Sequence, residues 1–145
     1  MSEQKRVVIT GLGTLNPIGN SVEEYWDALM EGKSGITDVD RFDVSAYTTR
    51  IAGSLKNFDP SPCFDKKEVR RTSLFIQYAV IAALEAIKDS GLNIEPEANQ
   101  IGVEIGSGIG GIEILEDMAH MLKEKGPSRI SPFTVPMMIC DMASG

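Results

Sequence analysis

A glycine-rich stretch has the residue types and spacing of a loop that binds the diphosphate of a dinucleotide. Gly106-x-Gly108-x-x-Gly111 follows an apolar run and precedes an amphipathic segment, as that loop requires. Dinucleotide binding also needs an acidic residue about 20 positions further on, at the end of the next strand. That distance falls at Glu124 and Lys125, inside an expected helix. The spacing therefore disfavours a nicotinamide or flavin cofactor, and a nucleotide-binding half-domain is the weakest hypothesis for this chain.

Residue types that carry nucleophilic or metal chemistry are sparse. His120 is the one histidine, and it lies in a polar helical segment with no partner at metal-ligand spacing. Cys63 follows a proline in a loop, and Cys140 lies in an apolar segment where we expect it to pack as a small hydrophobic residue. The sequence therefore assigns no catalytic residue, no metal site and no cofactor to these positions.

A charged cluster between Asp65 and Arg71 allows two interpretations. It holds four basic and two acidic side chains, a local charge of +2 in a chain of formal net charge −7. Basic side chains do not stabilise a helix N-terminus, where the helix dipole favours anions. The cluster is either a solvated helix start, which the residues alone favour, or a patch that binds an acidic partner.

The composition excludes several classes of protein. A net charge of −7 and a pI near 4.7 argue against a general nucleic-acid binder. No apolar run approaches the roughly 20 residues needed to cross a bilayer, and the first residues do not form a secretory signal. Two cysteines are too few for a disulfide scaffold, so we expect a cytoplasmic protein.

The elements that must position these residues alternate between strands and helices. Residues 6–10 and 101–105 are apolar runs typical of buried parallel strands, and residues 51–55 predict a short third strand. Helices are expected over residues 21–32, 73–90 and 112–125, with a charged turn or helix start over 65–71, an extended loop over 131–136 and a further helix from 137. Parallel sheets usually hold about 4–6 strands, so we expect the N-terminal part of a larger chain.

Four stretches carry a resemblance to a known family: residues 6–20, 75–78, 105–111 and 129–133. In this order they resemble the N-terminal part of the β-ketoacyl-[acyl carrier protein] synthases, the elongating condensing enzymes, and most of all their type II branch. The resemblance implies an α/β fold of the thiolase-like class, with layered αβαβα halves in a homodimer. Residues 1–145 would be an incomplete N-terminal half, one portion of a ketosynthase domain with no internal boundary.

The resemblance also implies an activity. The full-length parent would elongate fatty acids as an acyltransferase, by decarboxylative Claisen condensation of an acyl thioester with malonyl-[acyl carrier protein]. Its nucleophilic cysteine and both catalytic histidines would lie beyond residue 145, so the 145-residue fragment alone is expected to be inactive. The implied partners are acyl carrier protein and the acyl and malonyl thioesters, with no metal, cofactor, nucleic acid or membrane.

Three site residues follow from matching the basic cluster to the family. By resemblance, Lys67, Arg70 and Arg71 form a basic patch that docks the acidic carrier protein.

Three further residues match the family's acyl pocket. Gly108 and Ile109 match the loop that lines it, with Ile109 at the gate, and Phe133 matches an apolar loop near the pocket and dimer interface. Thr134 is a departure, since type II enzymes often have a second Phe there, and the acyl chain length stays open. Two alternatives also stay open: a non-catalytic pairing partner of the chain-length-factor type, and a polyketide ketosynthase.

Overall fold

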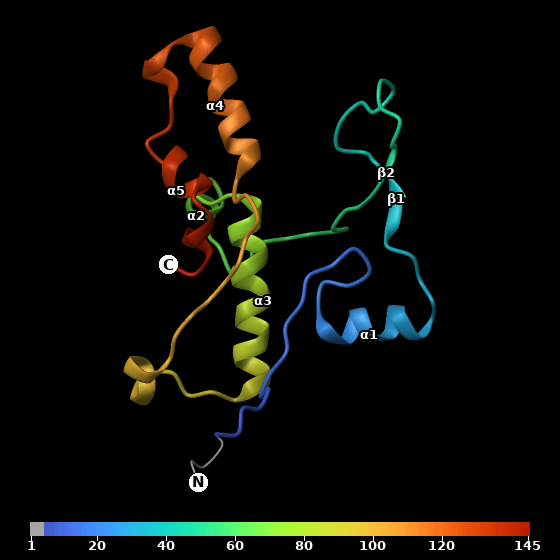
Figure 1. The fold of residues 1–145 in the computed structure, drawn as a ribbon, viewed down its shortest axis with the longest axis vertical. Helices are drawn as coiled ribbons and strands as arrows, with labels where there is room; N and C mark the ends of the chain where they lie inside the picture. Colours follow the sequence, from blue (N-terminus) through green and yellow to red (C-terminus); the bar gives the residue numbers. More distant parts are fainter. Residues whose placement is uncertain (1–4) are drawn as a thin grey trace. The chain divides into compact units, whose positions relative to one another are not determined.

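The computed structural model describes residues 5–145, which form two compact units. The first contains the chain up to Phe58 together with Ala82–Asn93, and the second contains Asp59–Ile81 and Ile94–Gly145. The long helix α3 (Leu74–Ser90) contributes its first turns to the second unit and its last turns to the first (Figure 1). The prediction of a domain without internal boundary stays a prediction.

The first unit begins with helix α1 (Val22–Met30) and a short antiparallel pair of strands, β1 (Ile36–Asp38) and β2 (Ile51–Gly53) (Figure 1). The Ser21 side chain caps α1 by accepting a hydrogen bond from the Glu24 amide at 3.2 Å. Gly32 follows the helix with a φ of 68°, a left-handed conformation that favours glycine. The predictions of this helix and of a strand near residue 51 are confirmed.

The segment that contains Gly11 and Gly13 packs on the alanine-rich side of α3. A Cβ atom at Gly11 would collide with the backbone of Ala86, and one at Gly13 with the backbone of Ala82. The Glu85 carboxylate joins the same segment to α1, because it accepts hydrogen bonds from Thr14 N at 2.8 Å and Val22 N at 2.8 Å. The alanine face of α3 therefore contacts an extended segment.

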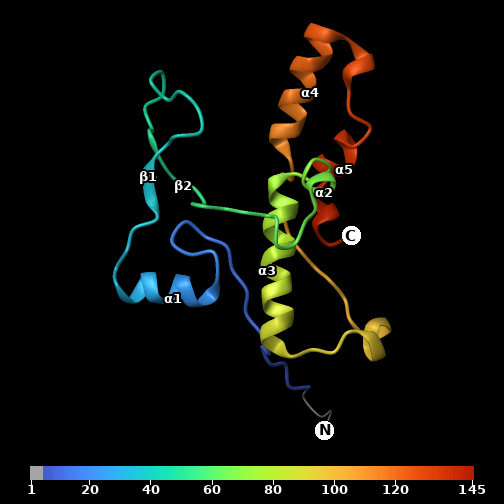
Figure 2. The same ribbon diagram turned by 180° about the vertical axis from the view of Figure 1, so that it is seen from behind.

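The second unit is built from short helices around the first turns of α3. In chain order they are α2 (Lys66–Val69), the 3₁₀ helix η1 (Glu95–Gln100), α4 (Ile112–Lys125), the 3₁₀ helix η2 (Pro127–Arg129), α5 (Thr134–Met138) and the 3₁₀ helix η3 (Cys140–Ala143). Figure 2 shows α5 running beside α2 and below α4. None of the helices in residues 5–145 is long and apolar enough to cross a membrane.

Two predicted strands are wrong for this structure. Residues 6–10 and 101–105 form no ladder, and Val7 and Ile9 are 94% and 83% exposed. A strand exists only through hydrogen bonds to a neighbour, and no other part of the described chain pairs with these segments. Their apolar pattern is typical of buried strands, but the described residues supply nothing to bury them.

The C-terminal segment differs from its predicted form in detail. The expected loop over residues 131–136 becomes helical at Thr134, where the amide and hydroxyl groups both donate to the Ser131 carbonyl oxygen. Pro136 is tolerated because it lies in the first turn of α5, where its missing N–H has no intrahelical partner. The helix expected from residue 137 is interrupted at Ile139, which is extended, and resumes as η3.

Candidate functional site

The basic cluster is presented by the shortest α-helix of the described chain, which depends on its cap. Asp65 accepts hydrogen bonds from Lys67 N at 2.6 Å and Glu68 N at 2.7 Å, while the Glu68 carboxylate accepts from Asp65 N at 2.7 Å. This reciprocal capping box satisfies donors that a four-residue helix cannot satisfy internally. Hydrogen bonds from the Glu68 and Lys67 amides lower the pKa of the Asp65 carboxyl group below its ordinary value.

The structure places the three predicted docking residues together at the end of α2. Lys67 lies within the helix, Arg70 is its C-cap and Arg71 follows directly. All three side chains are exposed, and the Arg71 amide donates to the Glu68 carbonyl oxygen at 2.9 Å. We call Lys67, Arg70 and Arg71 the basic patch. Sequence reasoning grouped these residues, and the fold keeps them on one short, solvent-exposed element.

A buried amide fixes the backbone behind the basic patch. Gln77 is only 3% exposed, and its Nε2 donates to the carbonyl oxygens of Val69 at 3.2 Å and Thr72 at 3.1 Å. These carbonyls lie at the last residue of α2 and in the connection to α3, so one side chain from α3 satisfies both. Sequence analysis included Gln77 only within the stretch 75–78 and gave it no role, because a single glutamine on an apolar helix face has no partner at a recognisable spacing.

Arg71 contacts a residue that the sequence assigned to a different role. Its guanidinium carbon lies 4.5 Å from the centroid of the Phe133 ring, within cation–π range. Phe133 is half-buried and precedes the first residue of α5, where its amide donates to the Ser131 hydroxyl at 3.1 Å. The predicted carrier patch and the predicted pocket residue Phe133 therefore meet directly.

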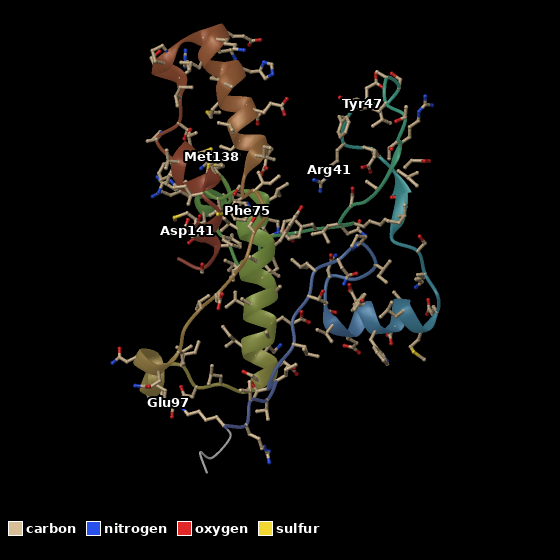
Figure 3. The ribbon with its side chains drawn as sticks, viewed as in Figure 1. Arg41, Tyr47, Phe75, Glu97, Met138 and Asp141 are labelled. Atoms are coloured by element: carbon tan, nitrogen blue, oxygen red, sulfur yellow. The ribbon has the colours of Figure 1, made fainter. Side chains whose placement is uncertain are left out.

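The glycine loop, residues 106–111, ends against α5. The Gly111 amide donates to the Met138 carbonyl oxygen at 3.1 Å, and a Cβ atom at Gly110 would collide with that same oxygen. Gly110 has a φ of 76°, which favours glycine, and its amide donates to the Ser107 hydroxyl at 3.0 Å. Figure 3 labels Met138 on α5 and Phe75 in the first turn of α3. The loop therefore leads into the N-terminus of α4 and contacts the C-terminal end of α5.

Gly108 and Ile109 occupy the outer part of the glycine loop. Gly108 is exposed and Ile109 is 67% exposed, so the described residues do not enclose these positions in a pocket. Phe133 is distant from Gly108 and Ile109 in the sequence, but α5 connects the two regions. Phe133 is the N-cap of α5, and the other end of this helix contacts Gly110 and Gly111. The predicted acyl-pocket role of Gly108, Ile109 and Phe133 stays a prediction.

Residues considered for nucleophilic or metal chemistry are scattered in the structure. His120 is exposed on α4, and Cys63 and Cys140 are exposed free cysteines. The expectation that Cys140 is packed is wrong here, since η3 leaves its side chain on the surface. Within residues 5–145 no group of three His, Cys, Asp or Glu side chains could hold a metal ion.

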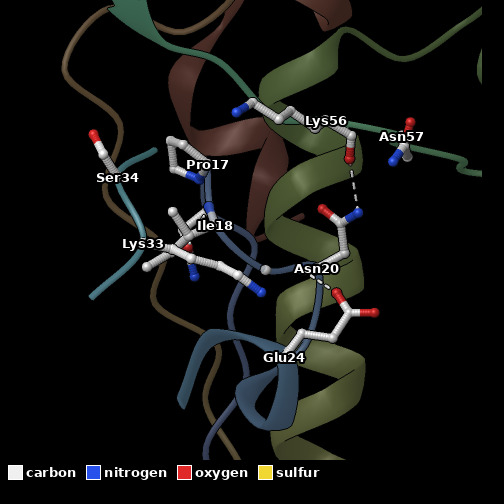
Figure 4. A pocket seen from close by; sticks show the side chains of 10 residues that line it. Pro17, Ile18, Asn20, Glu24, Lys33, Ser34, Lys56 and Asn57 are labelled. Carbon is white, nitrogen blue, oxygen red and sulfur yellow. Dashed lines mark hydrogen bonds between the residues drawn. The ribbon is translucent and has the colours of Figure 1, made fainter. Parts of the chain in front are cut away.

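The first unit holds a polar cavity of about 290 Å³ that sequence analysis did not predict (Figure 4). Asn20 lines the cavity, and its side-chain amide donates to the Lys56 carbonyl oxygen at 2.9 Å. The Asn20 backbone amide donates to the Glu24 carboxylate at 2.7 Å. Lys33, also on the wall, pairs with Glu31 at 2.6 Å. The residues that line it come from separate segments, and no spacing in the sequence brings them together.

Comparison with known proteins identifies the family. Residues 4–145 match the family model described as "Beta-ketoacyl synthase, N-terminal domain". The chain belongs to the β-ketoacyl synthase family. A curated relative from Staphylococcus aureus (strain COL), 3-oxoacyl-[acyl-carrier-protein] synthase 2, is 53% identical over 146 residues, which are 100% of this chain and 35% of the relative. The chain spans about a third of the length of the curated relatives that it matches.

Solved structures of ketosynthases share the fold of this family member. A β-ketoacyl synthase from Burkholderia phymatum STM815 is similar with a TM-score of 0.79 and 25% identity, covering 97% of this chain and 35% of that chain. The ishigamide ketosynthase/chain length factor is similar with a TM-score of 0.78 and 26% identity, again over 97% and 35%. The predicted resemblance to type II condensing enzymes and the thiolase-like fold class are confirmed.

Proposed function

We propose that the protein containing this ketosynthase segment elongates fatty acyl chains on acyl carrier protein. The supporting observation is identity of about half over the whole chain to proteins named 3-oxoacyl-[acyl-carrier-protein] synthase 2. In this reaction a cysteine thiolate beyond residue 145 takes the acyl group as a thioester. Malonyl-carrier thioester loses CO₂, and the resulting carbanion attacks the acyl thioester carbonyl. The new C–C bond forms as the cysteine thiolate leaves.

The role proposed for the described residues is recognition. Lys67, Arg70 and Arg71 are exposed cations on a capped helix, suited to meet the carboxylates of an acidic carrier protein. Gly108, Ile109 and Phe133 would form part of the wall that receives the acyl chain. The catalytic cysteine and the two histidines that stabilise developing oxyanions would come from the rest of the protein. The full protein would act as a homodimer in the cytoplasm, without a cofactor.

The proposal is tested with the full-length protein and defined carrier substrates. Purified protein is incubated with acyl- and malonyl-carrier protein, and the product is identified by mass spectrometry. We expect a 3-oxoacyl-carrier product two carbons longer than the acyl substrate, with release of one CO₂ per condensation. Replacing the nucleophilic cysteine by alanine is the control and should abolish condensation.

A pairing partner of the chain-length-factor type is the second candidate, because one similar structure is titled a ketosynthase/chain length factor. Such a partner would form no product alone and would produce it only when mixed with an active ketosynthase. A polyketide ketosynthase would instead return products extended several times without reduction. The same assay therefore separates all three, and absence of condensation under every pairing would overturn the proposed function.

A further inference from the structure

A series of contacts in the second unit begins at the side chain of Arg71 and continues to Phe133. Its backbone is held by the Glu68 carbonyl oxygen, and Gln77 fixes the carbonyls on either side of it in the chain. Among residues 5–145 the Arg71 guanidinium forms no ion pair, so the Phe133 ring is the contact that orients it. An unpaired guanidinium on an aromatic face stays available to a carboxylate from outside while its position is restricted.

The series continues through α5 to the glycine loop. The Phe133 carbonyl oxygen accepts a hydrogen bond from Met137 N at 2.9 Å, so the residue that holds Arg71 also forms the first turn of α5. One turn later, the carbonyls of Met137 and Met138 lie against Gly111 and Gly110. These last contacts join backbone to backbone, without a flexible side chain to absorb a displacement.

We propose that α5 couples the basic patch to the glycine loop, with Phe133 as the positioning residue that receives Arg71. The partner at the patch, an acidic carrier protein, rests on the proposed function. When carboxylates of the carrier draw the guanidinium, the force on the Phe133 ring acts on the first turn of α5. The far end of that helix is in contact with Gly110 and Gly111, and Ile109 is the next residue of the loop.

The coupling is reciprocal by thermodynamic linkage. Any ligand that shifts Ile109 and its loop changes affinity at the basic patch by the same factor with which the carrier changes affinity at the loop. An acyl group bound at the glycine loop would then change the affinity for the carrier protein without contacting the carrier. Phe133 acts in this scheme through Arg71 and α5, and has no role in bond making.

Carrier affinity of the full-length protein tests the Phe133–Arg71 step. Phe133→Leu keeps an apolar side chain and removes the aromatic face, so we expect affinity to fall about two- to fivefold. The salt dependence of binding should not change, because no charge is lost. In an Arg71→Gln background, Phe133→Leu should have no further effect. Lys67→Gln is the matched control, since it removes one charge from the same helix without a ring contact, and its effect should add to that of Phe133→Leu.

A methyl NMR titration tests transmission to the loop. Adding carrier protein should shift the Ile109 δ1-methyl signal of the full-length protein, and Phe133→Leu should remove most of that shift. The Ile76 methyl, whose side chain is 6% exposed, reports that the variant remains folded. An additive Phe133–Arg71 cycle, or an Ile109 shift that Phe133→Leu leaves intact, would overturn the coupling while leaving carrier docking in place. If the wild-type protein binds no carrier, the proposed function fails with it.

Discussion

The three cations of the basic patch are held to different degrees. The Arg71 guanidinium stacks on Phe133, whereas the side chains of Lys67 and Arg70 form no hydrogen bond or ion pair among the described residues. Freely rotating exposed cations act mainly through long-range attraction, which raises the association rate and weakens with salt. Arg71 is the member whose orientation the fold determines, so it is suited to specific contact rather than steering.

Charge reversal tests the patch as a whole. Replacing Lys67, Arg70 and Arg71 by Glu in the full-length protein should lower carrier affinity about tenfold or more at low salt, because attraction becomes repulsion. The loss should shrink as ionic strength rises. Binding measured by fluorescence anisotropy over a salt series checks both expectations.

The control for charge reversal uses three exposed cations elsewhere in the second unit. Lys123, Lys125 and Arg129 lie at the ends of α4 and η2, and their replacement by Glu changes the net charge by the same amount. Equal losses for the two triple variants would mean that carrier binding responds to total charge, not to the basic patch.

At the scale of elements, α2 depends on its capping box, in which Asp65 accepts hydrogen bonds from two helix amides. The Asp65 side chain has its pKa lowered by hydrogen bonds from the Glu68 and Lys67 amides. A carboxyl group with a depressed folded pKa stabilises the fold above its unfolded pKa, about 3.9, and loses that contribution as pH falls through the folded value. The cap is therefore fully formed at neutral pH and is lost only in strong acid.

Two charge-matched variants isolate the cap. Asp65→Ala and Asp65→Asn both remove the negative charge beside the basic patch, but only Asn can still accept the amide hydrogen bonds. We expect Asp65→Ala to bind carrier protein a few-fold more weakly than Asp65→Asn, because an uncapped four-residue helix presents its cations in many orientations. Isothermal titration of the two full-length variants measures the difference, and equal affinities would show that α2 needs no cap to dock.

The sequence predicted helices far better than strands, for a physical reason. The ends of helices α1, α3 and α4 were predicted to within a few residues. Helical hydrogen bonds and caps are local, so nearby residues such as Ser21 and Gly126 indicate where a helix begins or ends. The segments 6–10 and 101–105 have strand composition but no strand form, since pairing depends on residues distant in the sequence.

The candidate site divides in the same way. The basic patch was visible as a run of charges within seven residues, whereas Arg71 and Phe133 are far apart in the sequence and their contact matches no spacing rule. The cavity around Asn20 was missed because separate loops supply its walls. A family resemblance located both the patch and Phe133, but it did not indicate that they touch.

At the scale of the whole molecule, the described chain leaves many large apolar side chains accessible. The buried hydrophobic residues among those described are Ala28, Ile76 and Ala143, while Val7, Ile9 and Trp26 are largely exposed. Exposed apolar surface on this scale is typical of an interface with further protein.

The isolated polypeptide is therefore expected to associate with itself. Residues 1–145 expressed alone should bind a hydrophobic dye strongly, elute as aggregates in size-exclusion chromatography and form no condensation product with carrier substrates. The full-length protein, handled identically, is the reference and should bind little dye. A monomeric fragment that unfolds cooperatively, or one that makes 3-oxoacyl product, would contradict this expectation.

The packing of Gly11 and Gly13 on α3 has a consequence for biosynthesis. The hydrogen bond from Leu12 N to Asp89 joins groups 77 residues apart in the chain. At translation speeds of roughly 5–20 residues per second, the first segment leaves the ribosome about 4–15 s before its helical partner exists. During that interval Leu12 lacks its Asp89 partner, whereas Val7, Val8 and Ile9 are largely exposed even after α3 has packed. We expect this apolar run to be recognised by a chaperone that binds short apolar segments at the tunnel exit.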